Sequence, residues 1–150
     1  QHLYEYLKSG QLESQVTELE GLAFYFYIDG HLSRVTGTYR INQSWGENFP
    51  RYELEAGELV KKGTLYEPDY PSLLKYKISR FLAKSYVLQY FGVDPIQLLG
   101  KDAIAITTKL ILESKNKYVQ TFKNNDFYVV ILPNQETTII PYLKAKNIWY

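Results

Sequence analysis

Hydrophobic positions recur at helical intervals at the start of the chain. Intervals of three to five positions separate Leu3, Leu7, Leu12, Val16, Leu19 and Leu22. Such spacing is typical of the apolar stripe of an amphipathic helix. Ser9-Gly10 interrupts the stripe, because glycine is a strong helix breaker. We therefore expect either two short helices divided near Gly10 or one helix with a lead-in segment.

The following segment predicts a β-hairpin. Residues 22–28 are rich in aromatic side chains, residues 32–41 contain β-branched and aromatic side chains, and Asp29-Gly30 stands between them. A two-residue Asp-Gly loop favours the type I′ turn, whose twist matches that of paired strands. Successive side chains point to opposite faces of a strand. We therefore expect a core face and an outer face, the core face made by Phe24, Phe26, Ile28 and Val35 and the outer face by Tyr25, Tyr27 and Arg34.

A central helix is predicted over residues 72–91. Pro71 suits a position near the first turn, and Gly92 suits the end of a helix. The expected buried stripe consists of Leu74, Ile78, Phe81, Leu82 and Leu88. Basic side chains at positions i, i+3 and i+7 share the exposed flank of this helix, namely Lys77, Arg80 and Lys84.

Further strands are predicted on both sides of this helix. Residues 52–55 and 59–66 flank Ala56-Gly57 and extend the hairpin into a meander. Residues 103–112 fit either a strand or a buried helix, and their Ile and Thr content favours a strand. Residues 127–132 and 137–143 predict a second hairpin around 133–136. The pattern therefore predicts an α+β fold with a mostly antiparallel sheet packed against one main helix.

Composition fits a single soluble domain over residues 1–150. Apolar residues make up 45% of the chain and charged residues 22%, which is typical of globular proteins. Cysteine is absent, and His2 and His31 stand in no zinc-binding spacing. The sequence also contains no GxSxG motif and no phosphate-binding glycine loop. Zinc hydrolases, serine hydrolases and nucleotide-dependent enzymes are therefore disfavoured.

Charge is distributed unevenly along the chain. Residues 1–70 hold 6 basic and 11 acidic side chains, whereas residues 71–150 hold 11 basic and 5 acidic side chains. One interpretation is an anion-binding surface for nucleic acid, acidic lipid or an acidic partner, with Lys77, Arg80 and Lys84 as its candidate residues. The other interpretation is a mixed surface on which the charges of the two halves interleave.

Aromatic composition suggests a second candidate surface. The chain contains 15 tyrosines. Tyrosine combines an apolar ring with a polar hydroxyl, which suits interfaces and stacking platforms. Tyr25 and Tyr27 beside Arg34 are the candidate binding residues of this kind. The alternative is ordinary packing of tyrosines in a half-buried sheet.

One group of residues suggests catalysis. Residues 110–115 read Leu-Ile-Leu-Glu-Ser-Lys, an apolar stretch that ends in Glu-x-Lys, and a turn at Thr107-Thr108 would bring Asp102 opposite Glu113. This pattern resembles the core of the PD-(D/E)xK nuclease family. The resemblance implies Mg²⁺ held by Asp102 and Glu113, with Lys115 stabilising the charge on a phosphodiester attacked by water. The alternative is a surface ion pair.

The function that we expect from the sequence is a non-enzymatic binding or assembly module without a cofactor. Its partner is expected to be another protein or a second copy of the chain. Two alternatives stay open, namely a Mg²⁺-dependent nuclease using Asp102, Glu113 and Lys115, and a sequence-nonspecific nucleic-acid-binding domain using the basic C-terminal half. A second carboxylate group, Glu53, Glu55 and Glu58, fits either acid–base chemistry or a solvated strand face.

Overall fold

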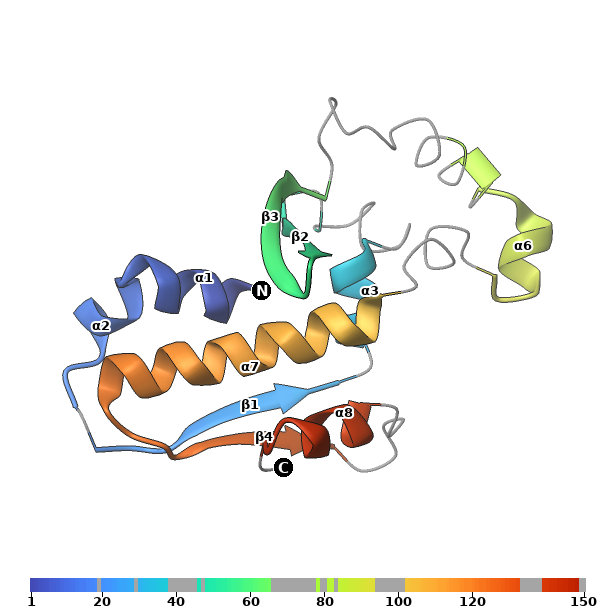
Figure 1. Ribbon diagram of the computed structural model, residues 1–150. Helices are drawn as coiled ribbons and strands as arrows, with labels where there is room; N and C mark the ends of the chain where they lie inside the picture. The colour runs from blue at the N-terminus through green and yellow to red at the C-terminus, as the bar shows by residue number, and fades with distance from the viewer. Residues whose placement is uncertain are drawn as a thin grey trace. The chain divides into compact units, whose positions relative to one another are not determined.

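The chain combines helices and strands, as the sequence predicts (Figure 1). The computed structural model describes residues 1–18, 20–28, 30–37, 46, 48–65, 78, 81–82, 84–93, 102–132 and 139–148. The chain divides into two compact units. Unit 1 comprises Gln1–His31 and Ile104–Tyr150, and unit 2 comprises Leu32–Ala103. The single domain expected over residues 1–150 stays a prediction.

Unit 1 begins with two short helices, α1 (His2–Ser9) and α2 (Gln11–Gln15). Gly10 separates them with a φ of 75°, a left-handed conformation that glycine adopts without steric cost. Leu7 of α1 is buried. The predicted division of the N-terminal helical region at Gly10 is therefore confirmed.

A parallel strand pair forms the sheet of unit 1. Strand β1 (Ala23–Tyr27) pairs with β4 (Phe127–Ile131), and the register places Ala23 opposite Phe127. Parallel strands cannot be joined by a tight turn and need a crossover connection, usually a helix. Helix α7 (Ala103–Phe122) directly precedes β4, and the sequence of unit 2 lies between β1 and α7. Strand β1 therefore pairs with the distant β4, and the predicted hairpin of 22–28 with 32–41 is wrong.

Helix α7 replaces the strand predicted over residues 103–112. Its buried positions include Thr107, Ile111, Ser114 and Phe122, which recur at helical intervals. The Ser114 Oγ donates a hydrogen bond of 2.7 Å to the carbonyl of Leu110, one turn earlier. Such bonds satisfy hydroxyl groups inside a helix. The strand prediction is wrong because the Ile and Thr content favours a strand, whereas the burial of residues at helical spacing stabilises a helix in the folded chain.

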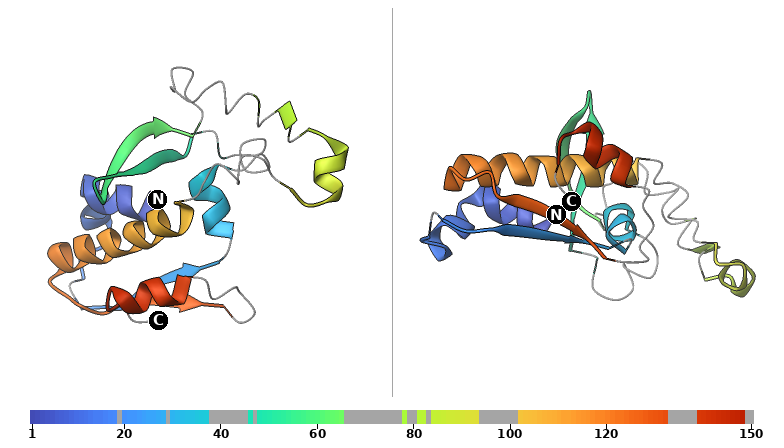
Figure 2. Two further views of the ribbon diagram at one scale, coloured as in Figure 1. Left: turned by 45° about the vertical axis from the view of Figure 1, so that its right-hand side comes forward. Right: turned by 90° about the horizontal axis from the view of Figure 1, so that it is seen from below.

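One face of the β1–β4 sheet carries the core of unit 1. Ile111 of α7 and Leu143 of α8 (Ile140–Ala145) pack in a buried cluster with Tyr27, Phe127 and Val129. Helices α7 and α8 therefore cover the same face of the sheet (Figures 1 and 2).

Helix α8 also overturns the predicted strand over residues 137–143. Pro141 lies in the first turn of α8, where proline is tolerated because its missing N–H needs no helical partner. The first strand of that predicted hairpin, 127–132, is confirmed as β4. The turn expected at 133–136 lies outside the described residues.

Unit 2 contains an antiparallel hairpin. Strand β2 (Pro50–Glu55) pairs with β3 (Glu58–Thr64) around Ala56 and Gly57, whose φ angles are 51° and 84°. Positive φ at both central positions is the requirement of a type I′ turn. The strands predicted around Ala56-Gly57 are therefore confirmed.

Two other predicted elements differ from the structure, namely the strand over residues 32–41 and the helix over residues 72–91. The predicted strand over 32–41 is wrong where it is described, since α3 (Gly30–Thr36) is helical. The predicted helix over 72–91 is not continuous, because Ser85 is extended (φ −67°, ψ 121°) directly before α6 (Tyr86–Tyr90). Three members of its expected buried stripe are exposed instead, namely Ile78, Phe81 and Leu82. A fourth member, Leu74, lies outside the described residues.

Candidate interaction surface

The two faces of the β1–β4 sheet differ in burial. Tyr27 is fully buried at 0% exposure, whereas Phe24 and Phe26 are 53% and 58% exposed. The prediction that Phe24 and Phe26 face the core and that Tyr25 and Tyr27 face outward is therefore wrong. Val35 is buried, as expected.

Both inward tyrosines of β1 contact His31. The Tyr25 hydroxyl lies 3.2 Å from His31 Nδ1, and the ring of Tyr27 meets the ring of His31 edge-on at 5.8 Å. For Tyr25 this contact satisfies the polar hydroxyl, and for Tyr27 it packs the buried ring. Phenylalanine and tyrosine alternate along β1, so either orientation of the strand places large aromatic rings on both faces. Alternation alone therefore did not determine which face is buried.

The exposed face of this sheet is apolar and continuous. Phe24 lies directly opposite Tyr128, with the two rings stacked at 5.9 Å, and Phe26 lies opposite Val130. Exposed leucines continue the same alternation beyond the strand ends, at Leu22 and Leu132. We call these six residues the outer sheet face, namely Leu22, Phe24, Phe26, Tyr128, Val130 and Leu132.

The outer sheet face is apolar surface that is left in contact with water. Parallel sheets in proteins normally have both faces covered, and apolar surface removed from water contributes about 25 cal/mol per Å². All six side chains are uncharged. At the rim, the Tyr128 hydroxyl donates a hydrogen bond of 3.4 Å to Asp126. An apolar centre with a polar edge is the usual anatomy of a protein interface.

The structure does not assemble the tyrosine platform that the sequence suggested. Tyr25 is half-buried and Tyr27 is fully buried, so the Tyr27 ring is not available to a ligand. Arg34 belongs to helix α3 rather than to a strand paired with β1. The exposed aromatic residues of β1 are instead the phenylalanines, which sequence reasoning placed in the core. Their signal in the sequence is an aromatic residue at every position from 24 to 27.

The predicted basic flank is described only in part. Lys84 is exposed and lies just before α6. Lys77 and Arg80 lie outside the described residues. The expectation of an anion-binding surface at these three residues therefore stays a prediction.

The three residues of the nuclease hypothesis do not converge. Asp102 directly precedes α7, whereas Glu113 lies about three turns along that helix. The Glu113 carboxylate is 3.2 Å from Lys109 Nζ, and Lys115 Nζ donates a hydrogen bond of 3.2 Å to the carbonyl of Asn147. The tight turn at Thr107-Thr108, on which the metal site depended, is helical instead. Within the described part of the chain, no three His, Cys, Asp or Glu side chains are grouped to hold a metal.

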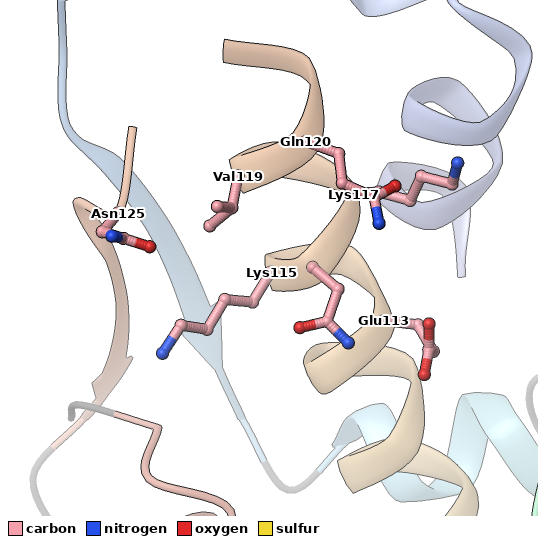
Figure 3. A pocket seen from close by; sticks show the side chains of 7 residues that line it. Glu113, Lys115, Lys117, Val119, Gln120 and Asn125 are labelled. Atoms are coloured by element: carbon pink, nitrogen blue, oxygen red, sulfur yellow. The ribbon is translucent and has the colours of Figure 1, made fainter. Parts of the chain in front are cut away.

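Glu113 and Lys115 do border a polar pocket of about 460 Å³ on the surface of α7. Its lining includes Lys117, Gln120 and Asn125. Figure 3 shows that the Glu113 and Lys115 side chains leave the helix in different directions. The pocket therefore presents separate polar groups rather than a catalytic pair.

A second polar pocket lies where Glu20 and Gly21 meet residues 123–126. Two side chains fix the backbone at this pocket, since Asn124 Nδ2 of its lining and the neighbouring Tyr118 hydroxyl both donate to the carbonyl of Gly21, at 2.7 and 3.3 Å. Burial, and then the nearby negative charge of Asp126, raise the pKa of the Tyr118 hydroxyl. Tyr118 therefore stays protonated and keeps donating at neutral pH.

Glu53 and Glu55 of the β2–β3 hairpin form ion pairs. Glu53 lies 3.7 Å from Arg51 Nε, and Glu55 pairs with Lys62. Arg51 also donates a hydrogen bond of 2.7 Å to the carbonyl of Lys62. These contacts favour the solvated strand face over acid–base chemistry at Glu53 and Glu55.

Comparison with known proteins gives no relative from which a function can be transferred. No protein-family model matches the chain, and neither a curated protein nor a solved structure matches it significantly. In the described part of the chain, no helix is both long enough and apolar enough to cross a membrane.

Proposed function

We propose that this chain is an assembly module that associates with a second copy of itself through the outer sheet face. The observation that carries the proposal is the exposure of Phe24 and Phe26, 53% and 58%, on a parallel sheet whose opposite face carries the buried core of unit 1. Parallel sheets are rarely left open on one side. Contiguous apolar surface of this kind marks interaction sites.

The charge of the face supports a second copy as the partner. A two-fold interface brings the same patch of both subunits together, so any net charge on the patch is repelled by the same charge on the other subunit. The outer sheet face carries no charged side chain. Its Phe24–Tyr128 stack and the flanking aliphatic side chains can pack on themselves without electrostatic repulsion.

The test measures mass against concentration by analytical ultracentrifugation. The wild-type chain is expected to show an average mass that rises with concentration. The double variant Phe24→Ser/Phe26→Ser is expected to remain monomeric, because it removes the two most exposed rings of β1.

A matched control is available on other elements of the same unit. Tyr6 and Tyr142 are 50% and 48% exposed, on α1 and α8. The variant Tyr6→Ser/Tyr142→Ser removes two equally exposed rings and is expected to associate like the wild type. A wild-type chain that stays monomeric at every concentration, or equal association of Phe24→Ser/Phe26→Ser, would refute the proposal.

A further inference from the structure

The sheet of unit 1 has an edge along β1 that no strand of the described chain occupies, because the sheet contains only β1 and β4. The Ala23 N–H donates a hydrogen bond of 2.8 Å to the carbonyl of Asp126, the residue before β4. Main-chain groups of successive residues point to opposite sides of a strand, so those of Phe24 and Phe26 point away from β4. Within the described part of the chain, these N–H and C=O groups have no hydrogen-bond partner.

The opposite edge of the sheet, on β4, is covered instead. By the same alternation, the main-chain groups of Phe127 and Val129 point away from β1. Both residues are 1% exposed, and the Phe127 N–H donates a hydrogen bond of 2.8 Å to the carbonyl of Asn125. Phe24 and Phe26 are more than half exposed. The sheet is therefore open to another chain along β1 and closed along β4.

Strand β1 also lacks the features that normally protect an edge. Charged side chains, proline and bulges keep edge strands from pairing with other chains. The β2–β3 hairpin has all three, since it begins at Pro50, has a register shift between Pro50 and Tyr52, and carries charged residues such as Lys61. Residues 23–27 contain no charged residue and no proline, and their register with β4 is unbroken. The main-chain groups of β1 therefore stay available for pairing.

The spacing of these main-chain groups identifies what can cover them. Phe24 and Phe26 each present an N–H and a C=O, two residues apart, and another extended main chain matches this repeat. Alternate side chains of an added strand would lie beside the Phe24 and Phe26 rings, where β-branched residues pair well with aromatic ones. The matching occupant is therefore an extended segment with β-branched apolar residues at every second position.

A second copy of the chain fits this edge less well. Two-fold pairing of two edges places the covered faces of both copies on the same side. Helix α7 runs alongside β1 over that face, so the α7 helices of both copies would have to share the space over the paired strands (Figures 1 and 2). A single extended segment brings no helix with it. Association of two copies through the outer sheet face uses side chains and leaves the edge unpaired.

We propose that the edge of β1 binds an extended segment of another protein, which adds to the sheet as a third strand. The main-chain groups of Phe24 and Phe26 form hydrogen bonds with the segment, and its β-branched side chains pack beside the two rings. The proposal is independent of self-association, because it uses main-chain groups that face-to-face association leaves unpaired.

The test is binding of the fluorescent peptide Lys-Thr-Val-Thr-Val-Thr-Val-Lys to the full chain, measured by fluorescence anisotropy. Phe26→Pro removes an N–H that points away from β4, so the hydrogen bonds between β1 and β4 are kept. Phe26→Ala removes the same ring but keeps this N–H. The peptide is expected to bind Phe26→Ala at least about tenfold more tightly than Phe26→Pro. The same peptide with every amide N-methylated is expected not to bind.

Amide hydrogen exchange of the wild-type chain gives a second measurement, which applies even if circular dichroism shows that Phe26→Pro does not fold. Saturating peptide is expected to slow the exchange of the Phe24 and Phe26 amides at least about tenfold, because they become hydrogen-bonded. Amides of the β2–β3 hairpin are expected to exchange at the same rate with and without peptide.

Four results would overturn the proposal. The first is no binding of the peptide to the wild-type chain, and the second is equal binding by Phe26→Ala and a folded Phe26→Pro. The third is unchanged exchange of the Phe24 and Phe26 amides while the peptide is bound, which would place the peptide elsewhere. The fourth is loss of peptide binding as the protein concentration rises, which would assign the edge to a second copy.

Discussion

The two strand pairs of this protein are built in opposite ways. Strands β2 and β3 are neighbours in the sequence and are joined by Ala56 and Gly57. Strands β1 and β4 come from distant parts of the chain, and their pairing goes together with the packing of α7 and α8 against one face. The antiparallel pair therefore depends mainly on a local turn, whereas the parallel pair depends on tertiary packing.

This difference explains where exposed aromatic surface arises. In the hairpin, charged side chains such as Glu53, Glu55 and Lys62 cover solvent-facing positions through ion pairs. In the parallel pair, both faces carry large apolar side chains, and α7 and α8 cover only one of them. The outer sheet face has the composition of a buried layer but the exposure of a surface, which is the basis for proposing an interface there.

The largest expected effect comes from the covered face. Phe127→Ala removes a ring that is 1% exposed in the core cluster and is expected to lower the free energy of unfolding by about 3–5 kcal/mol. Urea unfolding followed by circular dichroism measures this change. A loss below about 1 kcal/mol would mean that the sheet of unit 1 does not depend on this packing.

An intermediate effect is expected at the turn of the hairpin. Ala56 has a φ of 51°, a left-handed conformation that costs an alanine about 1 kcal/mol. Ala56→Asn is expected to stabilise β2–β3 by roughly 0.5–1 kcal/mol, because asparagine tolerates this conformation. Amide hydrogen exchange in β2 and β3 measures the gain, with Glu58→Asn as a control on the same hairpin. Slower exchange in the control alone would contradict the local account of this turn.

A smaller effect on stability is expected from the uncovered face. Phe26→Ala, measured in dilute monomer, is expected to change the free energy of unfolding by no more than about 0.5 kcal/mol, because its ring is largely in water. The same urea titration that is used for Phe127→Ala applies. A loss comparable with that of Phe127→Ala would show that the two faces are equally buried in the monomer.

The smallest effect is expected from Tyr118 on the pH dependence of the stability of unit 1. The pKa of Tyr118 is raised above its ordinary value of 10.0 in the folded chain, by burial first and by Asp126 second. The neutral hydroxyl is thus favoured on folding, so its contribution to stability is complete below pH 10 and is lost as the pH rises through the raised pKa. The free energy of unfolding of Tyr118→Phe is expected to fall less steeply than that of the wild type as the pH rises above 10. It also loses the hydrogen bond to the Gly21 carbonyl, whose length of 3.3 Å and exposure to water keep its contribution at neutral pH below about 0.5 kcal/mol.

The sequence predicted the elements that depend on local chemistry. Gly10 between the N-terminal helices and the turn at Ala56-Gly57 are positions where backbone conformation follows from neighbouring residues. The sequence could not predict the pairing of β1. Asp29-Gly30 indicates a local hairpin, whereas the strand that pairs with β1 is β4, far along the chain. Helix α7 was predicted as a strand, although Ile111 and Phe122 lie on one helical face with Ser114.

Site prediction failed for a related reason. Tyr25, Phe24, Tyr27 and Phe26 are all large and apolar, so hydropathy does not separate the inner face from the outer face of β1. The deciding contacts are those of His31 and α7 with the inner positions, which only the folded chain provides. The sequence therefore assigned Phe24 and Phe26 to the core and proposed Tyr25 and Tyr27 as binding residues, whereas the structure exposes the phenylalanines and buries Tyr27.

The most direct test of the proposed interface is hydroxyl-radical footprinting at low and at high protein concentration. If the outer sheet face joins two copies, oxidation of Phe24, Phe26 and Tyr128 falls as concentration rises, while oxidation of the exposed Tyr6 and Tyr142 stays constant. Unchanged oxidation of Phe24, Phe26 and Tyr128 at concentrations where the chain is associated would place the contact elsewhere and contradict the account.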